Sequence, residues 1–270
     1  MEIVQTAEGE ALFGAFLDDQ INRCVGVASS LADSQLPRVS RLYALFSSII
    51  EDAISIRILG NDGRTNQAYI VARALLERIA NFCFLQLCTE EEFSDYLDYS
   101  LNKAGRRLDR SIEAGGKVHA RISLQEGDFA LPPEIAAAIS KFTSDRGREK
   151  TRWTHVSLPE RVAVIEAIVG QTGLFVSLLT IYADASEALH GTLYGSVFHL
   201  GAYDAGAVPT DQASLDRHRH TTLSCLYLMT GGSIGTLLTV LKTVGETNVS
   251  ELANDSLVAF EIAAIKAGLR

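Results

Sequence analysis

The chain has 270 residues, of which 47% are hydrophobic and only 21% are charged. This length suffices for one large domain, or for a core domain with an appended lobe, and for a sizeable core. The shortage of charge predicts that some apolar surface is covered by another subunit or meets a membrane. The net charge of −9 argues against a protein that coats nucleic acid non-specifically, because such binding depends on many Lys and Arg contacts to phosphates. A small basic cleft is still compatible with that charge.

The cysteines and the first residues indicate the compartment. Cys24, Cys83, Cys88 and Cys225 show no CxxC spacing, so we expect buried free thiols rather than a metal site or a disulfide framework. The opening residues, MEIVQTAEGEALFG, carry acids where a signal peptide carries Lys or Arg before an apolar core. We therefore expect a cytoplasmic protein.

Apolar residues recur at steps of three and four residues over most of the chain, which predicts an all-α fold. A stop signal, GNDG, stands at residues 60–63, and Thr89 followed by three glutamates offers an N-cap with acids in the first turn. The helices expected in the first half of the chain span residues 8–32, about 39–59, 64 or 65 to 87, and 89 to roughly 112.

The helical pattern weakens over residues 115–158, which contain a Gly-Gly pair, an LPPE turn and the mixed-charge run DRGREKTRW. We expect an irregular insertion there, with one short helix at 134–143. Helices are then expected at 159–169, at 174–189 after a break near GQTG, at 212–244 and at 250–267, whereas the Gly-rich residues 190–206 are expected to be irregular. The whole chain, residues 1–270, is thus predicted to be a single helical domain, a multi-helix bundle with an insertion at 115–158.

Two uncharged segments need to be checked as membrane spans, residues 167–183 and 221–241, and the length of about 20 residues that a span needs is right for the second. The second contains the GxxxG pattern from Gly231 to Gly235, which lets helices approach closely in membranes. However, it also holds seven Ser or Thr residues, and GQTG interrupts the first segment. We expect buried core helices rather than membrane spans.

Polar residues lie inside an apolar face of the helix expected at 64–87. At about 100° per residue, Arg73, Glu77 and Asn81 fall in one stripe that apolar residues bracket. The helix expected at 174–189 shows the same arrangement, since Tyr182 and Ser186 continue an apolar stripe toward His190.

Two nearly apolar helices that each carry a polar seam are expected to bring the seams together, so that every buried group finds a partner. We therefore predict that Glu77 lies near His190 or Tyr182 and that Arg73 neutralises Glu77. The alternative is purely structural. Arg and Glu four residues apart form a common helix pair, a Ser within a helix often bonds to its own backbone, and His190 before Gly191 can end a helix.

The segments ARALLERIANFCFL (72–85) and YADASEALHG (182–191) together resemble a bacterial family catalogued only as a domain of unknown function. Its members look like helical proteins with an Arg-x-x-x-Glu helix and a later Tyr-x-x-x-Ser-x-x-x-His helix. The resemblance covers roughly residues 50–195 and includes WTHVSLPER (153–161). It implies that Arg73, Glu77, Tyr182, Ser186 and His190 belong to one constellation, but it brings no established reaction.

One hypothesis is a metal-independent ribonuclease or nucleotide-processing enzyme, similar in outline to the helical HEPN toxins and phage-defence effectors of bacteria. His190 would act as acid or base, Arg73 would hold phosphate, Glu77 would orient either of them, and Tyr182 would donate a hydrogen bond. Substrate contacts are expected from Asn81, Arg106, Arg107 and Arg152. HEPN ribonucleases carry Arg and then His within four to six residues on one helix, which this chain lacks, so any such site would be rearranged.

The other hypothesis is a binding or interaction module in which the seams fix the packing of the helices or line a pocket, and the low surface charge reflects a homodimer. A cognate partner protein fits this hypothesis equally well. The motifs GxxxxGK[ST], GxGxxG at a strand-to-helix turn, HExxH and GxSxG are absent, so no cofactor or metal is predicted. The sequence thus leaves open whether the protein is an enzyme and what it binds.

Overall fold

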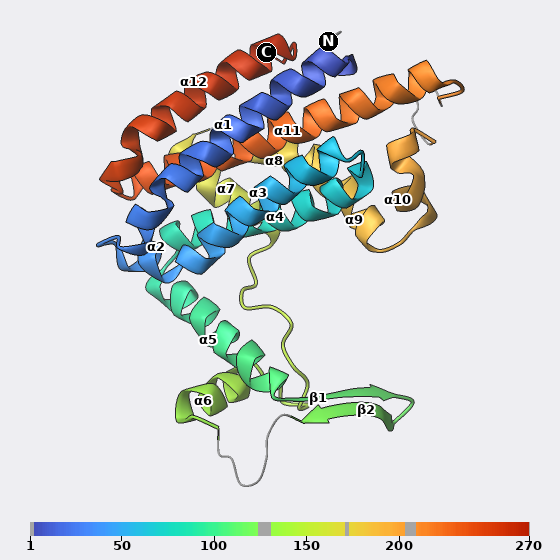
Figure 1. Ribbon diagram of the computed structural model, residues 1–270. Coiled ribbons are helices and arrows are strands. Elements are labelled where there is room, and N and C mark those ends of the chain that lie inside the picture. Colours follow the sequence, from blue (N-terminus) through green and yellow to red (C-terminus); the bar gives the residue numbers. More distant parts are fainter. Residues whose placement is uncertain (1–2, 124–130, 171–172, 203–208, 270) are drawn as a thin grey trace. The chain divides into compact units, whose positions relative to one another are not determined.

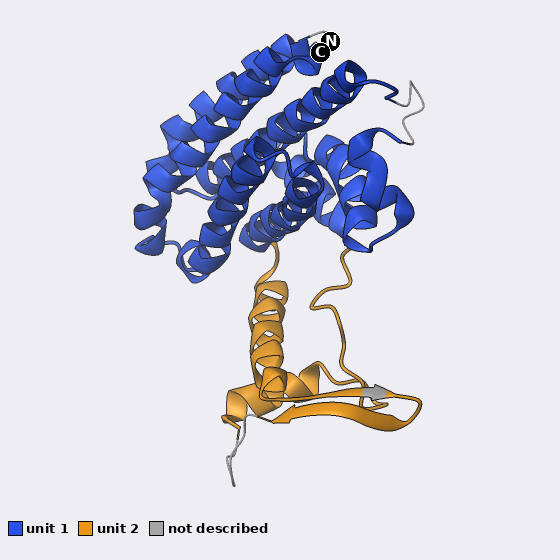
Figure 2. Cartoon of the chain, turned by 45° about the vertical axis from the view of Figure 1, so that its right-hand side comes forward, with its two compact units in different colours: residues 1–87, 158–270 blue, residues 88–157 orange. Residues whose placement is uncertain are grey.

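The computed structural model describes residues 3–123, 131–170, 173–202 and 209–269. It is mostly helical, at 76% helix, and includes one small antiparallel two-stranded hairpin (Figure 1). The all-α fold class predicted from the sequence is therefore confirmed. The chain divides into two compact units, one of residues 1–87 and 158–270 (unit 1) and one of residues 88–157 (unit 2) (Figure 2). The prediction of a single domain stays a prediction.

Unit 1 follows the predicted order of helices with two local differences. Residues 39–59 do not form one helix, since a break at Leu42 separates α2 from α3. The segment predicted to be irregular contains a short helix and a 3₁₀ turn at Phe198–Leu200, while its residues 203–206 lie outside the described residues. The helices of unit 1 are α1 (Ala7–Ala32), α2 (Pro37–Arg41), α3 (Tyr43–Asn61), α4 (Thr65–Leu87), α7 (Leu158–Val169), α8 (Leu174–Ser177), α9 (Ala183–Leu189), α10 (Leu193–Val197), α11 (Gln212–Thr243) and α12 (Ser250–Lys266).

Helix α11 is the core helix that the sequence predicts, and it packs against α1, α4 and α12. By length and composition it could cross a membrane, but 89% of its most apolar 18-residue window is buried within the protein. Its glycines allow the close packing. A Cβ at Gly231 would overlap the Phe16 ring of α1, and one at Gly235 would lie 2.7 Å from Ser256 Oγ of α12.

The other uncharged segment, residues 167–183, is not a buried core helix, and that prediction is wrong. Most of its described residues belong to α7, α8 and a π-helical segment, Leu178–Tyr182, and these elements pack against α4 or α11. Their outer face stays open to solvent, so Leu179 is 78% exposed and Ile168 is 49% exposed. An apolar surface therefore remains on unit 1.

All four cysteines are free, as the sequence predicts, but only two of them are buried. Burial raises the pKa of the Cys24 thiol to about 12 and also raises that of Cys83. Both thiols therefore stay protonated and act as small apolar side chains of the core. Cys88 and Cys225 are only partly buried.

Unit 2 begins with the capping box that the sequence indicates. Thr89 Oγ1 accepts a hydrogen bond from the Glu92 main-chain nitrogen over 3.2 Å, and Glu92 Oε2 accepts one from the Thr89 nitrogen over 3.0 Å. Its elements are α5 (Glu90–Arg107), β1 (Asp109–Ala114), β2 (Lys117–Ser123) and α6 (Pro133–Lys141).

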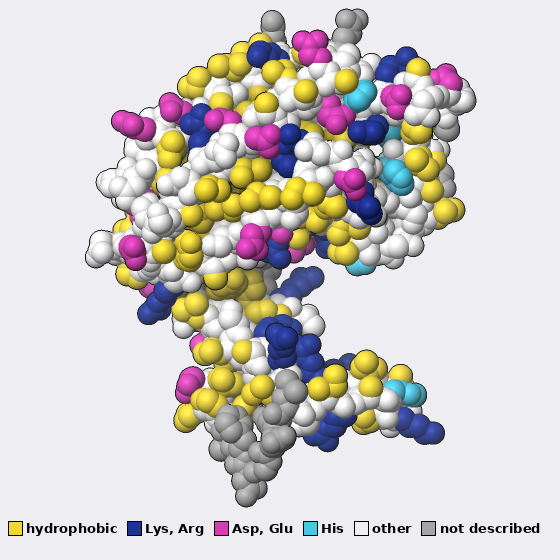
Figure 3. Space-filling model, viewed as in Figure 1, with side chains coloured by type: hydrophobic (Ala, Val, Ile, Leu, Met, Phe, Trp, Pro, Cys, Tyr) yellow, Lys and Arg dark blue, Asp and Glu magenta, His cyan; other side chains and the backbone are white. Residues whose placement is uncertain are grey.

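The helix predicted to reach residue 112 therefore ends at Arg107, and a β-hairpin replaces part of the predicted irregular insertion. The hairpin turns at Gly115 and Gly116, whose φ angles of 58° and 72° fit the two central positions of a tight hairpin turn. Lys and Arg side chains gather over α5 and the hairpin (Figure 3). This unit is thus a small element of two helices and a hairpin with a local patch of basic side chains.

Candidate functional site

Helix α4 carries the two charged residues that the sequence singles out. Arg73 and Glu77 lie one helical turn apart, with 3.5 Å between Arg73 Nη2 and Glu77 Oε1. The Arg73 side chain is 17% exposed, whereas that of Glu77 is 44% exposed. The pair therefore consists of a largely enclosed cation and a carboxylate that solvent can reach.

Tyr182 joins this pair from the end of the π-helical segment that precedes α9. Its hydroxyl donates a hydrogen bond to Glu77 Oε1 over 2.7 Å and accepts one from Arg73 Nη2 over 3.3 Å. The Arg73 guanidinium also lies over the Tyr182 ring, 4.8 Å from its centroid. The predicted contact of Glu77 with Tyr182, with Arg73 beside the carboxylate, is confirmed.

The protonation state of Tyr182 follows from its surroundings. Burial raises the pKa of its hydroxyl, and the hydrogen bond to Glu77 and the charge of that carboxylate raise it further, which outweighs the opposite effect of Arg73. The phenol therefore stays neutral at physiological pH and remains a hydrogen-bond donor. A neutral donor between a carboxylate and a guanidinium can stabilise negative charge that develops beside it.

Arg73 has more hydrogen-bonding capacity than this cluster uses. Its Nε and Nη1 atoms are buried and have no hydrogen-bond partner among the described residues. Buried polar groups of folded proteins are nearly always paired with protein groups or water. Two donors of the guanidinium are thus available to a bound water molecule or an anionic ligand.

Ser186 and His190 are not drawn into the cluster. The Ser186 hydroxyl donates to the main-chain oxygen of Tyr182 over 2.6 Å, which is the backbone bonding expected of a serine within a helix. His190 ends α9, its side chain is exposed, and Gly191 follows with a φ of 67°. His190 stands eight residues after Tyr182, about 12 Å further along the helix axis. Of the two predicted alternatives, Glu77 near Tyr182 is the one that forms, and no hydrogen bond or ion pair joins Glu77 to His190.

Asn81, expected to bind substrate, instead joins two helices of unit 1. Its Oδ1 atom accepts a hydrogen bond from Arg161 Nη1 of α7. The sequence signal for Arg161 was the WTHVSLPER segment between the two signatures, although no role follows from that segment alone. Asn81 and Arg161 thus hold α7 against α4, next to the turn that carries Glu77.

The three basic residues expected to bind substrate, Arg106, Arg107 and Arg152, all belong to unit 2. Arg106 donates to Asn102 Oδ1 over 2.8 Å and to Thr143 Oγ1 over 2.5 Å, so it links α5 to the end of α6. Arg107 and Arg152 are exposed. Arg106 is therefore a structural residue, while the other two stay candidates for ligand binding.

A second polar cluster of unit 1 was not foreseen from the sequence. Arg57 of α3 donates to both carboxylate oxygens of Asp18 of α1, over 2.7 and 2.9 Å, and its guanidinium lies 4.7 Å from the ring centroid of Tyr227 of α11. On α1 and α11 there is also a contact between Glu10 and His220, with 2.6 Å between Glu10 Oε2 and His220 Nδ1.

The described part of the chain holds no group of three or more His, Cys, Asp and Glu side chains spaced as metal ligands.

The surroundings of His199 predict that the stability of unit 1 depends on pH. Burial lowers the pKa of this imidazole, and the neighbouring His218 lowers it further. The unfolded chain therefore takes up a proton at a higher pH than the folded chain does. The stabilising effect is present above about pH 6.5, the pKa of an unperturbed histidine, and is lost as the pH falls below it.

We expect the melting temperature to fall from about pH 7 to about pH 5 and the substitution His199→Asn to make that fall smaller. Thermal unfolding followed by circular dichroism across this range measures both slopes. Equal slopes for wild type and variant would assign the pH dependence to other groups.

Comparison with known proteins adds one match. Residues 40–206 match a family described as a family of unknown function (DUF5677). That range covers more than half of the chain and includes Arg73, Glu77 and Tyr182. Neither the curated proteins nor the solved structures contain a match.

Proposed function

We propose that this chain, which belongs to the DUF5677 family of unknown function, processes RNA or nucleotide phosphates at the cluster of Arg73, Glu77 and Tyr182 by metal-independent acid–base chemistry. One observation carries the proposal. The Tyr182 hydroxyl is held between a solvent-accessible carboxylate and a guanidinium that keeps two unused donors. A base, a neutral donor and a cation thus meet within one cluster, as cleavage of a phosphodiester requires.

In the simplest reaction, the RNA 2′-hydroxyl attacks the adjacent phosphorus, the bond to the 5′-oxygen breaks, and a 2′,3′-cyclic phosphate and a 5′-hydroxyl result. Glu77 accepts the proton of the 2′-hydroxyl. Arg73 binds the non-bridging phosphate oxygens. The Tyr182 hydroxyl has one proton, which it donates to Glu77 in the free protein. As Glu77 takes the proton of the 2′-hydroxyl, the Tyr182 hydroxyl turns from that carboxyl to a phosphate oxygen and donates to the charge that develops there. The leaving oxygen takes its proton from solvent water. His190, two turns away, contacts a neighbouring nucleotide instead of the reacting phosphate.

An intracellular toxin or defence effector is the role we propose for such an enzyme.

A second candidate function is a non-enzymatic interaction module, and a specific observation favours it. Unit 1 exposes the apolar side chains of Val164 and Ile168 on α7 and of Phe175, Val176 and Leu179 after it, and such a surface is suited to a second copy of the chain or a partner protein. In this function the Tyr182 hydrogen bonds only attach the π-helical segment to α4.

The first test is incubation of the purified protein with mixed-sequence RNA in EDTA, followed by analysis of the product ends. We expect cleavage with 2′,3′-cyclic phosphate ends, and we expect Tyr182→Phe to reduce the rate by about 10²-fold, the usual loss when one donor to developing charge is removed. Circular dichroism confirms that the variant is folded. Intact RNA with the wild-type protein, together with early melting of Tyr182→Phe, would favour the interaction module.

A further inference from the structure

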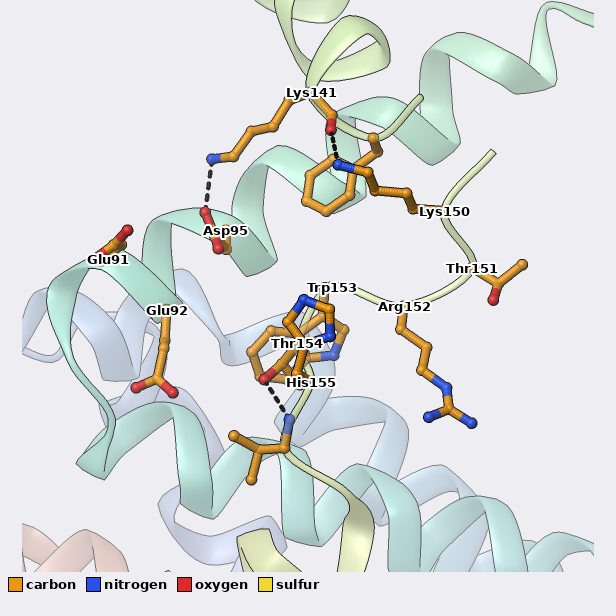
Figure 4. A pocket seen from close by; sticks show the side chains of 12 residues that line it. Glu91, Glu92, Asp95, Lys141, Lys150, Thr151, Arg152, Trp153, Thr154 and His155 are labelled. Carbon is orange, nitrogen blue, oxygen red and sulfur yellow. Dashed lines mark hydrogen bonds and ion pairs between the residues drawn. The ribbon is translucent and has the colours of Figure 1, made fainter. Parts of the chain in front are cut away.

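Unit 2 contains an open cavity of about 500 Å³ that no part of the proposed function uses. The first turns of α5, the end of α6 and the extended residues 150–156 surround it (Figure 4). Its volume falls within the range of roughly 300–1,000 Å³ that is usual for sites of small organic ligands. The side chains that matter most for its chemistry are Glu91, Glu92, Lys150, Arg152 and Trp153.

Aromatic side chains form one wall of this cavity and are held from behind. The Trp153 ring is half-buried and packs edge-on against Tyr96 of α5, with 5.3 Å between the ring centroids. Phe142, which also lines the cavity, packs in the same way against Tyr99 at 5.1 Å. A supported aromatic face of this kind suits the stacking of a planar ring.

Two cations of the cavity, Lys150 and Arg152, have no ion pair among the described residues. Lys150 Nζ donates to the main-chain oxygen of Lys141 over 3.0 Å, which satisfies one of its donors without neutralising its charge. Arg152 is exposed, and the described residues give it no ion pair. Lys141 differs, because Asp95 and Asp98 lie 2.7 and 2.6 Å from its Nζ and neutralise it. Lys150 and Arg152 are therefore the cations that an anion meets.

The opposite end is acidic. Glu91 and Glu92 lie on the opposite side of Trp153 from Arg152, while the Lys150 ammonium group lies beside the main-chain oxygen of Lys141 (Figure 4). Glu92 uses its Oε2 atom in the capping box, accepting from both the nitrogen and the hydroxyl of Thr89 over 3.0 Å, so its other oxygen is left for a ligand. An ionised carboxylate only accepts hydrogen bonds, and this end therefore selects a ligand that donates them.

We propose that this cavity binds a nucleotide whose base carries an exocyclic amino group. The base stacks on Trp153, its amino group donates to Glu92 or Glu91, and its phosphate binds Arg152 on the other side of the ring, with Lys150 adding positive charge to the cavity. The order of the three features, acceptor, aromatic face and cations, matches the order of amino group, ring and phosphate in such a nucleotide. The site lies within unit 2, and binding there does not depend on any activity at Arg73, Glu77 and Tyr182.

The single tryptophan of the chain is Trp153, so intrinsic fluorescence reports directly on this cavity. The full-length protein is titrated at constant ionic strength with CMP, AMP, GMP, UMP, inorganic phosphate and a short single-stranded RNA. We expect the amino-bearing nucleotides to change the emission and UMP to bind at least about 5-fold more weakly, because it lacks the donor at that ring position. Tighter binding of the oligonucleotide than of CMP would identify RNA as the source of the base, and equal binding would identify the free nucleotide.

Variants locate the binding. Arg152→Ala is expected to weaken CMP binding by about 10-fold, since it removes one phosphate contact. The matched control Arg146→Ala removes an exposed cation of the same unit that does not line the cavity, and it is expected to leave the affinity unchanged. Glu92→Gln keeps the N-cap but not the carboxylate, so it is expected to reduce the preference for CMP over UMP.

Three results would overturn the proposal. One is that no nucleotide changes the Trp153 emission and that isothermal titration calorimetry also detects no heat of binding. Another is an equal loss of affinity in Arg152→Ala and Arg146→Ala, which would indicate non-specific attraction to charge. The third is binding of inorganic phosphate as tightly as CMP, which would leave the aromatic wall and the acidic end without a role.

Discussion

Glu77→Gln is expected to lower RNA cleavage by about 10²–10⁴-fold, the usual contribution of a general base. The change removes the negative charge and the ability to accept a proton, yet the amide oxygen still accepts the hydrogen bond from Tyr182. The fold should therefore survive the substitution. Single-turnover cleavage in EDTA gives the rate, and urea unfolding gives the stability.

The chain provides a matched control for this variant. Asp19 and Arg23 of α1 also form an ion pair four residues apart, with side chains 48% and 17% exposed, close to the 44% and 17% of Glu77 and Arg73. Asp19→Asn should change stability by no more than about 0.5 kcal/mol, as for an ordinary helix pair, and should leave cleavage unchanged. If Glu77→Gln cleaves like Asp19→Asn, Glu77 is not the base.

Gly60→Ala is expected to lower the free energy of unfolding by about 1–3 kcal/mol, the cost of overpacking a core. Alanine within a helix normally stabilises a protein relative to glycine by roughly 0.5–1 kcal/mol. At Gly60, however, a Cβ would overlap the hydroxyl of the buried Tyr227 and come within 2.9 Å of its Cζ atom. The steric cost therefore reverses the usual sign.

A double-mutant cycle isolates this contact. Because the overlap involves the hydroxyl, Gly60→Ala in a Tyr227→Phe background should cost less than it does in the wild type. Gly26→Ala in α1 is the matched control, since nothing lies within 4 Å of a Cβ at that position, and it should stabilise the protein. Urea unfolding of all variants measures the coupling. Additive effects at positions 60 and 227 would contradict this account of the packing.

The sequence predicts the helical class and most helix positions because apolar periodicity and caps are local signals. Thr89 with Glu92 is such a cap, and the contact between α4 and Tyr182 follows from the need to pair buried polar groups. The hairpin was missed even though its signal is present. Gly115 and Gly116 stand between residues that alternate in polarity, which is typical of a two-residue hairpin turn, but the preceding amphipathic pattern led to a longer helix.

Other features depend on information that a single sequence does not contain. Asn81 and Arg161 are 80 residues apart, and only the packing of α7 on α4 pairs them. Likewise, Arg57 meets Asp18 and Tyr227 from three separate helices. A helical wheel gives the direction of a side chain but not the neighbour that it meets, so the expected contact of Glu77 with His190 was as plausible from sequence as the contact with Tyr182.

The π-helical segment Leu178–Tyr182 has a consequence for variation in chain length. A π turn closes hydrogen bonds between residues five apart rather than four, so it accommodates one residue more than the α-helical turn it replaces. A homologue that lacks one residue in this segment can therefore close a regular helix, with the preceding residues turned by about 100° relative to Tyr182. Alignments across this region should tolerate a one-residue gap before the tyrosine, and a missing residue there need not mean that the tyrosine has been lost.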